Sequence, residues 1–320
     1  MFGNLKGWII AAVVLLIEVA LVIWLLRLDD LSGPTAFGAD PQNMQPIALP
    51  FDPRPLVPAT VQKDAGPLYR QAVRTMSDNR LIYERFAQRA DAAALPQLEA
   101  FKFAIEARNM ARATIFEDRL DQIIRYNQPD RTELVALEQL GKGLLNAGTL
   151  DMTSNPEQAR KYFEAAFNLG YHLFNERIVF QQLSIGINLM SIAADGLSGL
   201  PGADSAKFEQ YRSTRGEYFT NRVMPVWGVL STIDNRKIGK HVGDMFAFAR
   251  NSKERMFRVE AILAMGRLRF NIGTGGRAGD QQGAERLLRE IAENPSSAPA
   301  DKAAARLALE LTVEQFRTIQ

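Results

Sequence analysis

Two histidines are the only imidazoles in this chain of 320 residues, and each has a carboxylate one helical turn away. His172 precedes Glu176 by four positions, and His241 precedes Asp244 by three. On a helix, either spacing places both side chains on one face, where an imidazole and a carboxylate can hold a metal ion. Two ligands are too few to define a metal site, and hydrogen bonding at the surface or at a helix end is the commoner role of such a histidine. We therefore expect no metal at either pair.

Other catalytic chemistry finds little support in the residue types. The chain has no cysteine, which removes thiolate nucleophiles and every cysteine-based zinc or iron–sulfur site. It contains no G-x-S-x-G or H-E-x-x-H pattern. We expect no catalytic residue, no cofactor and no enzymatic activity. One alternative stays open, because two carboxylates of the kind that cleave sugars can meet only in the fold.

A glycine-rich segment from Gly273 to Gly283 superficially resembles a phosphate-binding loop. It lacks the GK[ST] ending of such loops, and no strand is predicted before it. We interpret it as a flexible connector between helices.

Basic residues outnumber acidic ones nine to three between Arg236 and Arg269, with phenylalanines among them. A solvated charged face is the ordinary explanation of such a run, and the alternative is a surface for an anionic partner or lipid headgroups. We do not expect nucleic acid as a partner. The residues of this predicted surface are Arg236, Lys237, Lys240, Arg250, Lys253, Arg255 and Arg258.

An apolar segment near the N-terminus fits a membrane-spanning helix. Nineteen residues from Trp8 to Leu26 are apolar except for Glu18, and a helix of that length can cross the hydrocarbon core. We predict a short head over residues 1–7 and a transmembrane helix over 8–28. Gly7, Ala11 and Glu18 share one face of that helix, and small residues with a carboxylate in the bilayer favour contact with a partner helix. The alternative is a monomeric anchor whose Glu18 is protonated in lipid.

The apolar segment is too long for the core of a cleaved signal peptide, which spans about 7 to 15 residues. The nearest small-x-small site, Ala36-Phe37-Gly38, also lies well beyond it. Basic residues flank both ends, Lys6 on one side and Arg27 on the other, so the charge bias is weak. A short head before a large domain is typical of a head in the cytoplasm. We therefore predict a single-pass protein of the inner or plasma membrane with its C-terminal domain outside the cytoplasm.

Two further regions follow the membrane segment. Prolines recur from residue 29 to 65, which predicts an extended, semi-rigid linker. From Pro67 onward, apolar residues recur three and four apart, which predicts an all-α domain over 66–320. Residues 223–233 are the one stretch that could be a strand, although a helix kinked at Pro225 fits them equally well. The predicted helices cover about 66–90, 95–126, 131–147, 156–172, 175–197, 204–234, 242–271, 281–293 and 299–317.

An internal repeat appears when the chain is shifted by 125 residues, which aligns 134–168 with 259–293. In each copy a glycine interrupts an apolar helix, a second glycine follows seven positions later, and an alanine precedes a bulky residue by four. The small residues would let two antiparallel helices approach closely, and the bulky side chain would fill the gap above them. These packing residues are Gly141, Gly148, Ala159 and Phe163 in the first copy, and Gly266, Gly273, Ala284 and Leu288 in the second.

The first copy resembles the tetratricopeptide-repeat class. It places Leu140-Gly141, Leu144, Gly148, Ala159, Phe163 and Ala166 in the order of that motif, although its loop between the helices is longer than the standard one. The second copy is a weaker match, with Arg269 at the position of Leu144. The resemblance implies an array of helical hairpins whose grooves hold a peptide or a partner helix. The alternative is a non-repetitive helical bundle.

Anchor, linker and repeat together predict a membrane-anchored helical scaffold or assembly subunit of a cell-envelope complex. Its expected partners are other membrane or envelope proteins and the bilayer itself. Two alternatives remain, a membrane-tethered hydrolase acting on glycans and a self-assembling structural spacer.

Overall fold

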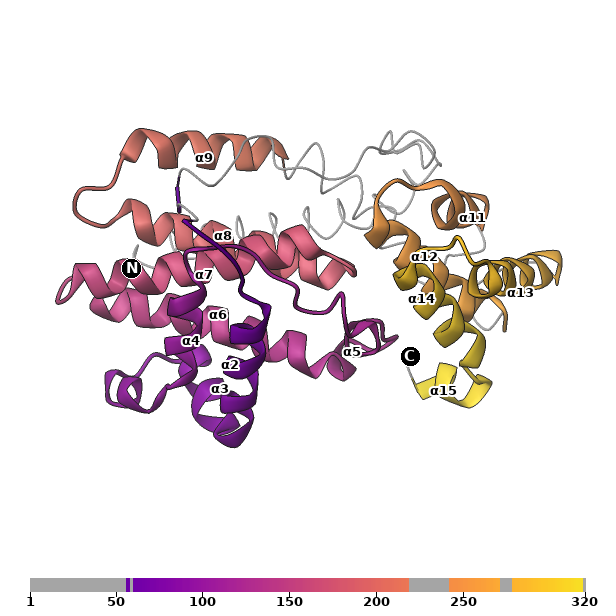
Figure 1. The fold of residues 1–320 in the computed structure, drawn as a ribbon, viewed down its shortest axis with the longest axis horizontal. Coiled ribbons are helices and arrows are strands. Elements are labelled where there is room, and N and C mark those ends of the chain that lie inside the picture. The colour runs from indigo at the N-terminus through magenta and orange to yellow at the C-terminus, as the bar shows by residue number, and fades with distance from the viewer. Residues whose placement is uncertain (1–55, 58–59, 219–241, 271–277, 319–320) are drawn as a thin grey trace, which may run out of the picture. The chain divides into compact units, whose positions relative to one another are not determined.

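The computed structural model describes residues 56–57, 60–218, 242–270 and 278–318 (Figure 1). All of these belong to one unit, residues 41–320. Within the described residues, no helix combines the length and the apolar character that crossing a bilayer requires. The predictions that lie outside the described residues are the head, the transmembrane helix 8–28, Gly7, Ala11, Glu18, most of the linker, the strand candidate 223–233, Arg236, Lys237, Lys240, His241 and Gly273.

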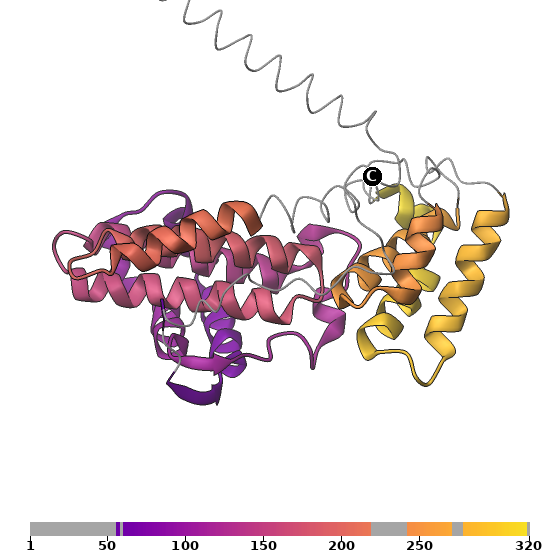
Figure 2. The same cartoon turned by 90° about the horizontal axis from the view of Figure 1, so that it is seen from above.

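The described part of the chain is mostly helical, as the apolar periodicity predicts. Its longest helices are α6 (Thr132–Asp151), α7 (Pro156–Glu176) and α8 (Phe180–Ser198), and each contacts the other two. Figures 1 and 2 show these three helices side by side. The start of α7 has a capping residue, because the side chain of Asn155 accepts a hydrogen bond from the backbone N–H of Gln158.

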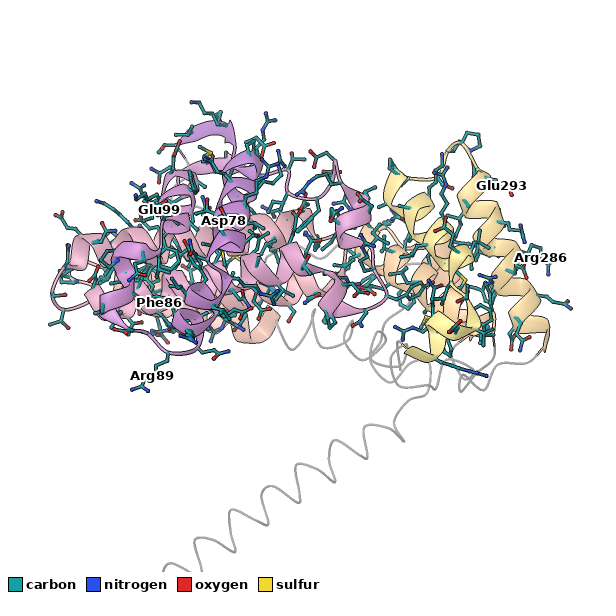
Figure 3. All side chains as sticks on the ribbon, turned by 90° about the horizontal axis from the view of Figure 1, so that it is seen from below. Asp78, Phe86, Arg89, Glu99, Arg286 and Glu293 are labelled. Atoms are coloured by element: carbon teal, nitrogen blue, oxygen red, sulfur yellow. The ribbon has the colours of Figure 1, made fainter. Side chains whose placement is uncertain are left out.

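Shorter helices from the N-terminal part of the domain pack against this group. Helix α3 contacts α6, α4 contacts both α2 and α7, and α2 also contacts α6. The rings of Phe86 and Phe101 lie 5.9 Å apart in the core between them. Figure 3 shows Phe86 on the inside, whereas Asp78, Arg89 and Glu99 lie at the exposed surface. These elements are α2 (Gly66–Asp78), α3 (Arg80–Gln88), the 3-10 helix η1 (Ala92–Gln97), α4 (Ala100–Ala107), α5 (Leu120–Ile123) and the 3-10 helix η2 (Gln128–Asp130).

The C-terminal helices form a second packed group around α12, which contacts α11, α13 and α14. Before them, α9 lies against α8 and buries Phe208 and Tyr211. Arg286 and Glu293 are exposed on α13, as Figure 3 shows. The bounds are α9 (Ser205–Tyr218), α11 (Val242–Asn251), α12 (Arg255–Leu268), α13 (Ala278–Glu293), α14 (Pro299–Glu310) and α15 (Val313–Thr318).

Three predicted helices are interrupted in the structure. The helix predicted over 66–90 breaks at Asn79, whose φ of −135° and ψ of 37° are not helical. The helix over 242–271 stops at Asn251 and restarts at Arg255, because the hydroxyl of Ser252 accepts the backbone N–H of Glu254 instead. The helix over 299–317 breaks between α14 and α15.

The helix predicted over 95–126 is wrong for most of its length. Only the end of η1, α4 and the short α5 are helical there, and β2 (Met110–Arg112) pairs in parallel with β1 (Val61–Asp64). Strand β1 lies inside the predicted linker, and Val57 and Ala65 on either side of it are buried. The last residues of the predicted linker are therefore extended, but they belong to the folded domain. A partner far away in the sequence decides this conformation, which local periodicity does not report.

Candidate functional site

A buried row of polar side chains runs along α7. Asn168, His172 and Glu176 follow one another at intervals of four residues, and their exposed fractions are 1%, 2% and 5%. The interval places all three on one face of the helix. A surface role for His172, the common expectation for such a residue, is therefore wrong. Buried polar groups need partners, and this row finds them in the segment around β2.

His172 bridges α2 and β2. Its Nδ1 lies 2.9 Å from the hydroxyl of Tyr69, and its Nε2 lies 3.1 Å from the backbone carbonyl of Met110. Because a carbonyl can only accept, Nε2 carries a hydrogen and donates it, while Nδ1 shares a hydrogen bond with the Tyr69 hydroxyl. Both ring nitrogens are thereby engaged by protein groups.

Glu176 closes the row at the end of α7. Its Oε1 accepts the backbone N–H groups of Ile115, Phe116 and Glu117 at 2.7, 2.8 and 3.0 Å, and its Oε2 accepts the side-chain amide of Gln182 at 3.0 Å. Burial raises the pKa of Glu176, and these hydrogen bonds offset that effect only in part. The carboxylate thus holds the backbone of the loop after β2.

Asn168 begins the row and covers one edge of β2. Its side-chain amide donates to the backbone carbonyls of Arg108 and Met110, the second at 3.2 Å. An uncovered strand edge is a site of unwanted pairing, and a side-chain donor removes part of that edge. Together with His172, this residue satisfies backbone groups that a helix would otherwise have paired.

The same loop is also fixed from the β1 side. One carboxylate oxygen of Asp64 accepts the backbone N–H groups of Gly66 and Thr114, both at 2.8 Å. Burial acts to raise the pKa of Asp64, but the hydrogen bonds from Thr114 and Gly66 outweigh it and lower the pKa. A Cβ atom at Gly66 would lie 2.8 Å from the carbonyl carbon of Thr114, so only glycine fits this approach.

The chemistry of the polar row is therefore structural. The spacing of His172 and Glu176 correctly indicates a shared helix face, but their partners are protein groups. Among the described residues, no three His, Cys, Asp or Glu side chains are placed to share a metal ion. Sequence reasoning missed Asn168, although a polar residue every fourth position along an otherwise buried helix is a readable signal.

The described arginines of the predicted basic surface form ion pairs within the domain. Arg250 lies 3.5 Å from Glu290, and Arg255 lies 2.9 Å from Glu117. Arg258 lies 2.8 Å from Asp301. Burial raises the pKa of Asp301, and the nearby arginine offsets this rise only in part. Lys253 is exposed. Among the described residues of this predicted surface, the three arginines are thus matched by acidic side chains of the same chain.

The packing residues of the repeat lie where helices approach one another. A Cβ atom at Gly141 would lie 2.5 Å from a methyl group of Leu189 on α8, and one at Gly148 would lie 2.8 Å from the ring of Phe163 on α7. In the second copy, a Cβ atom at Gly266 would lie 3.0 Å from Cβ of Ala308 on α14. Ala159, Phe163, Ala284 and Leu288 are all buried.

The first glycine of each copy also faces a third helix. A Cβ atom at Gly141 would meet Leu189 of α8, and one at Gly266 would meet the hydroxyl of Tyr126 as well as Ala308 of α14. The sequence alignment covers only the first two helices of each copy. Each pair of helices also contacts a third helix, α8 in the first copy and α14 in the second, but Leu189 and Ala308 are 119 residues apart and so are not equivalent under the shift of 125.

A cavity of about 260 Å³ opens between α2 and α6. Its wall is mixed, with apolar side chains from both helices and polar groups that include Arg80 and Glu133. The lining residues are Val73, Met76, Ser77, Arg80, Pro129, Thr132, Glu133, Val135, Ala136 and Gln139.

Comparison with known proteins finds no matching family model, no matching curated protein and no matching solved structure.

Proposed function

We propose that this chain is a membrane-anchored helical scaffold, in which a repeat-like domain binds other envelope proteins. The observation that carries the proposal is that the first glycine of each repeat copy lies at a helix contact, Gly141 against Leu189 of α8 and Gly266 against Tyr126 and Ala308 of α14. Stacked helical units of this kind bury a continuous core and leave long surfaces for partners. This arrangement favours, within the proposal, a fold of the tetratricopeptide type.

The chemistry of the buried row supports the same proposal. Tyr69, His172 and Glu176 bond protein groups in the core, so their part is to fix the loop after β2. Rigid placement of backbone and helices is what a binding surface requires.

The membrane anchor rests on the sequence alone. The apolar segment 8–26 and its flanking charges support attachment to an inner or plasma membrane, with the helical domain outside the cytoplasm. Attachment would hold the scaffold beside other membrane proteins and raise their effective concentration.

The test is recovery of partners from intact membranes. The full chain, tagged at its C-terminus, is crosslinked in cells, extracted in mild detergent and analysed for the proteins that accompany it. We expect defined partner proteins in the crosslinked sample and their loss when Gly141→Leu disrupts the packing of α6 on α8. Recovery of the isolated chain alone, with and without crosslinking, would contradict the proposed function.

A further inference from the structure

The outer side of α3 combines an apolar side chain with positive charge. Leu81, Arg85 and Gln88 follow one another at intervals of four and three residues, so they lie on one side of the helix. All three are exposed, whereas Tyr83 and Phe86 on the opposite side are buried. Helix α3 thus packs on α6 through one side and presents the other side to its surroundings.

Leu81 is the most exposed large apolar side chain among the described residues, at 64%. A single exposed leucine needs no explanation by itself. Its neighbours Arg85 and Gln88, however, have aliphatic stems that can lie along the same apolar surface while their polar ends stay in water. Apolar and basic side chains together hold a helix at a bilayer surface, the first by burial among the lipids and the second by attraction to anionic headgroups.

The arginines at this side of α3 are not matched by acidic side chains. Arg85 and Arg89 form no ion pair with another described residue, and Glu84, the acidic residue of α3, is bonded by Arg80. Asp91, which follows the helix, accepts a backbone N–H at the start of η1. Figure 3 shows Arg89 projecting outward at the end of α3.

A surface of anionic lipid headgroups complements this side of α3. Its phosphate groups would meet the two guanidinium groups, and Leu81 would enter the boundary between headgroups and acyl chains. The sequence brings such a surface within reach, because the chain between residues 27 and 55 joins the domain to the apolar segment 8–26. We propose that α3 docks on the anionic surface of the bilayer to which the chain is anchored, with Leu81, Arg85 and Arg89 in contact with the lipid.

The inference rests on the proposed membrane anchorage and adds the side of the domain that faces the lipid. Two arginines and one leucine would not hold a free domain on a membrane. Tethering raises the local concentration of lipid around the domain, so that a weak contact is populated in the anchored chain. Because the attraction acts between charges at a water interface, added salt weakens it.

Site-specific fluorescence tests the contact, because the chain contains no cysteine that would compete for a label. Leu81→Cys is introduced into the full-length chain, labelled with a fluorescent dye and reconstituted into vesicles that contain lipid with a nitroxide on its headgroup. The vesicles consist of phosphatidylcholine alone or of an equal mixture of phosphatidylcholine and phosphatidylglycerol. We expect the nitroxide to quench the dye at least about three times more strongly in the mixture, and we expect high salt to remove the difference.

Two controls locate the contact on α3. The same dye at Ile192→Cys of α8, a position that is 45% exposed, should show no dependence on phosphatidylglycerol. In the chain labelled on α3, Arg85→Gln combined with Arg89→Gln should abolish the difference. Arg286→Gln combined with Arg306→Gln removes the same charge from exposed positions of α13 and α14 and should leave the difference unchanged.

Flotation of the vesicles separates failure of the docking from failure of the anchorage. If the chain floats with both kinds of vesicle and quenching at position 81 is equal in them, the docking is wrong and the anchorage stands. Quenching that is as strong at position 192 as at position 81 would overturn the docking through α3 as well. If the chain stays behind when the vesicles float, the anchorage fails and the docking fails with it. Circular dichroism checks that each variant keeps the helix content of the parent chain.

Discussion

At the scale of single residues, the polar row of α7 shows why a histidine and a glutamate one turn apart need not bind a metal. Asn168, His172 and Glu176 replace the hydrogen bonds that a helix would have supplied to the segment 108–117. The cost of burying them is offset only while each partner is present. Substitutions in the row should therefore act on stability.

Glu176→Ala should destabilise the domain by about 3 kcal/mol or more, because it leaves three buried backbone N–H groups and the Gln182 amide without their acceptor. Glu176→Gln should cost less, since its carbonyl oxygen can still accept from the loop. Urea unfolding followed by circular dichroism measures both variants. Equal losses in the two variants would show that the loop contacts are not the source of the effect.

Asp64 should make stability depend on pH in the acid range. Its pKa in the folded chain is lowered from 3.8, so its contribution is present above about pH 3.8 and disappears as the pH falls through the lower folded value. The stability difference between the parent chain and Asp64→Asn should therefore shrink between pH 7 and pH 3. Urea unfolding at both pH values measures it, and a constant difference would contradict the assignment.

At the scale of elements, glycines decide how closely the helices pack. Gly170 of α7 and Gly186 of α8 face each other, and a Cβ atom on either would lie 2.7 Å from the carbonyl oxygen of the other. The two helices can approach to this distance only without side chains. Gly243 of α11 is different, because a Cβ atom there would meet nothing within 4 Å.

Gly186→Ala should destabilise the domain by about 1–3 kcal/mol, because the added methyl group forces α7 and α8 apart. Gly243→Ala is the matched control and should stabilise it by about 0.5–1 kcal/mol, since alanine is the better helix former in open space. Thermal unfolding of both variants shows whether each substitution lowers or raises the stability of the domain. A stabilising effect of Gly186→Ala would mean that α7 and α8 are not in close contact.

At the scale of the whole described unit, ion pairs connect the end of α7 with the start of α12. Arg177 lies 3.1 Å from Glu254, and the two side chains are 13% and 4% exposed. Arg255 donates to the backbone carbonyl of Glu176 as well as to Glu117. The end of α7 that carries Glu176 thus also contacts the start of α12.

Arg177→Met should cost about 3–5 kcal/mol, because it removes the arginine that pairs with the buried carboxylate of Glu254. Arg177→Met combined with Glu254→Leu should recover much of that loss. Arg212→Met removes an exposed pair with Asp195 and should cost less than about 1 kcal/mol. Urea unfolding of the three variants measures the loss of stability in each. Equal losses in Arg177→Met and Arg212→Met would refute the prediction.

The helical character and the shared face of His172 and Glu176 both follow from the sequence, because each depends on residues within a turn or two of one another. The shift of 125 residues likewise locates the glycines that sit at helix contacts. Local pattern also explains where prediction failed, since the apolar spacing over 95–126 fits a helix and does not report the strand β2.

Only the tertiary structure decided which distant segments pair with one another. Met110 pairs with Val61 across nearly fifty residues, and Glu176 binds the N–H groups of Ile115 and its neighbours about sixty residues away. It also decided that Gly141 and Gly266 face a third helix, and that the arginines at 250, 255 and 258 have acidic neighbours. Such contacts form only when distant segments meet, and their energy then outweighs the weak local preferences of the chain.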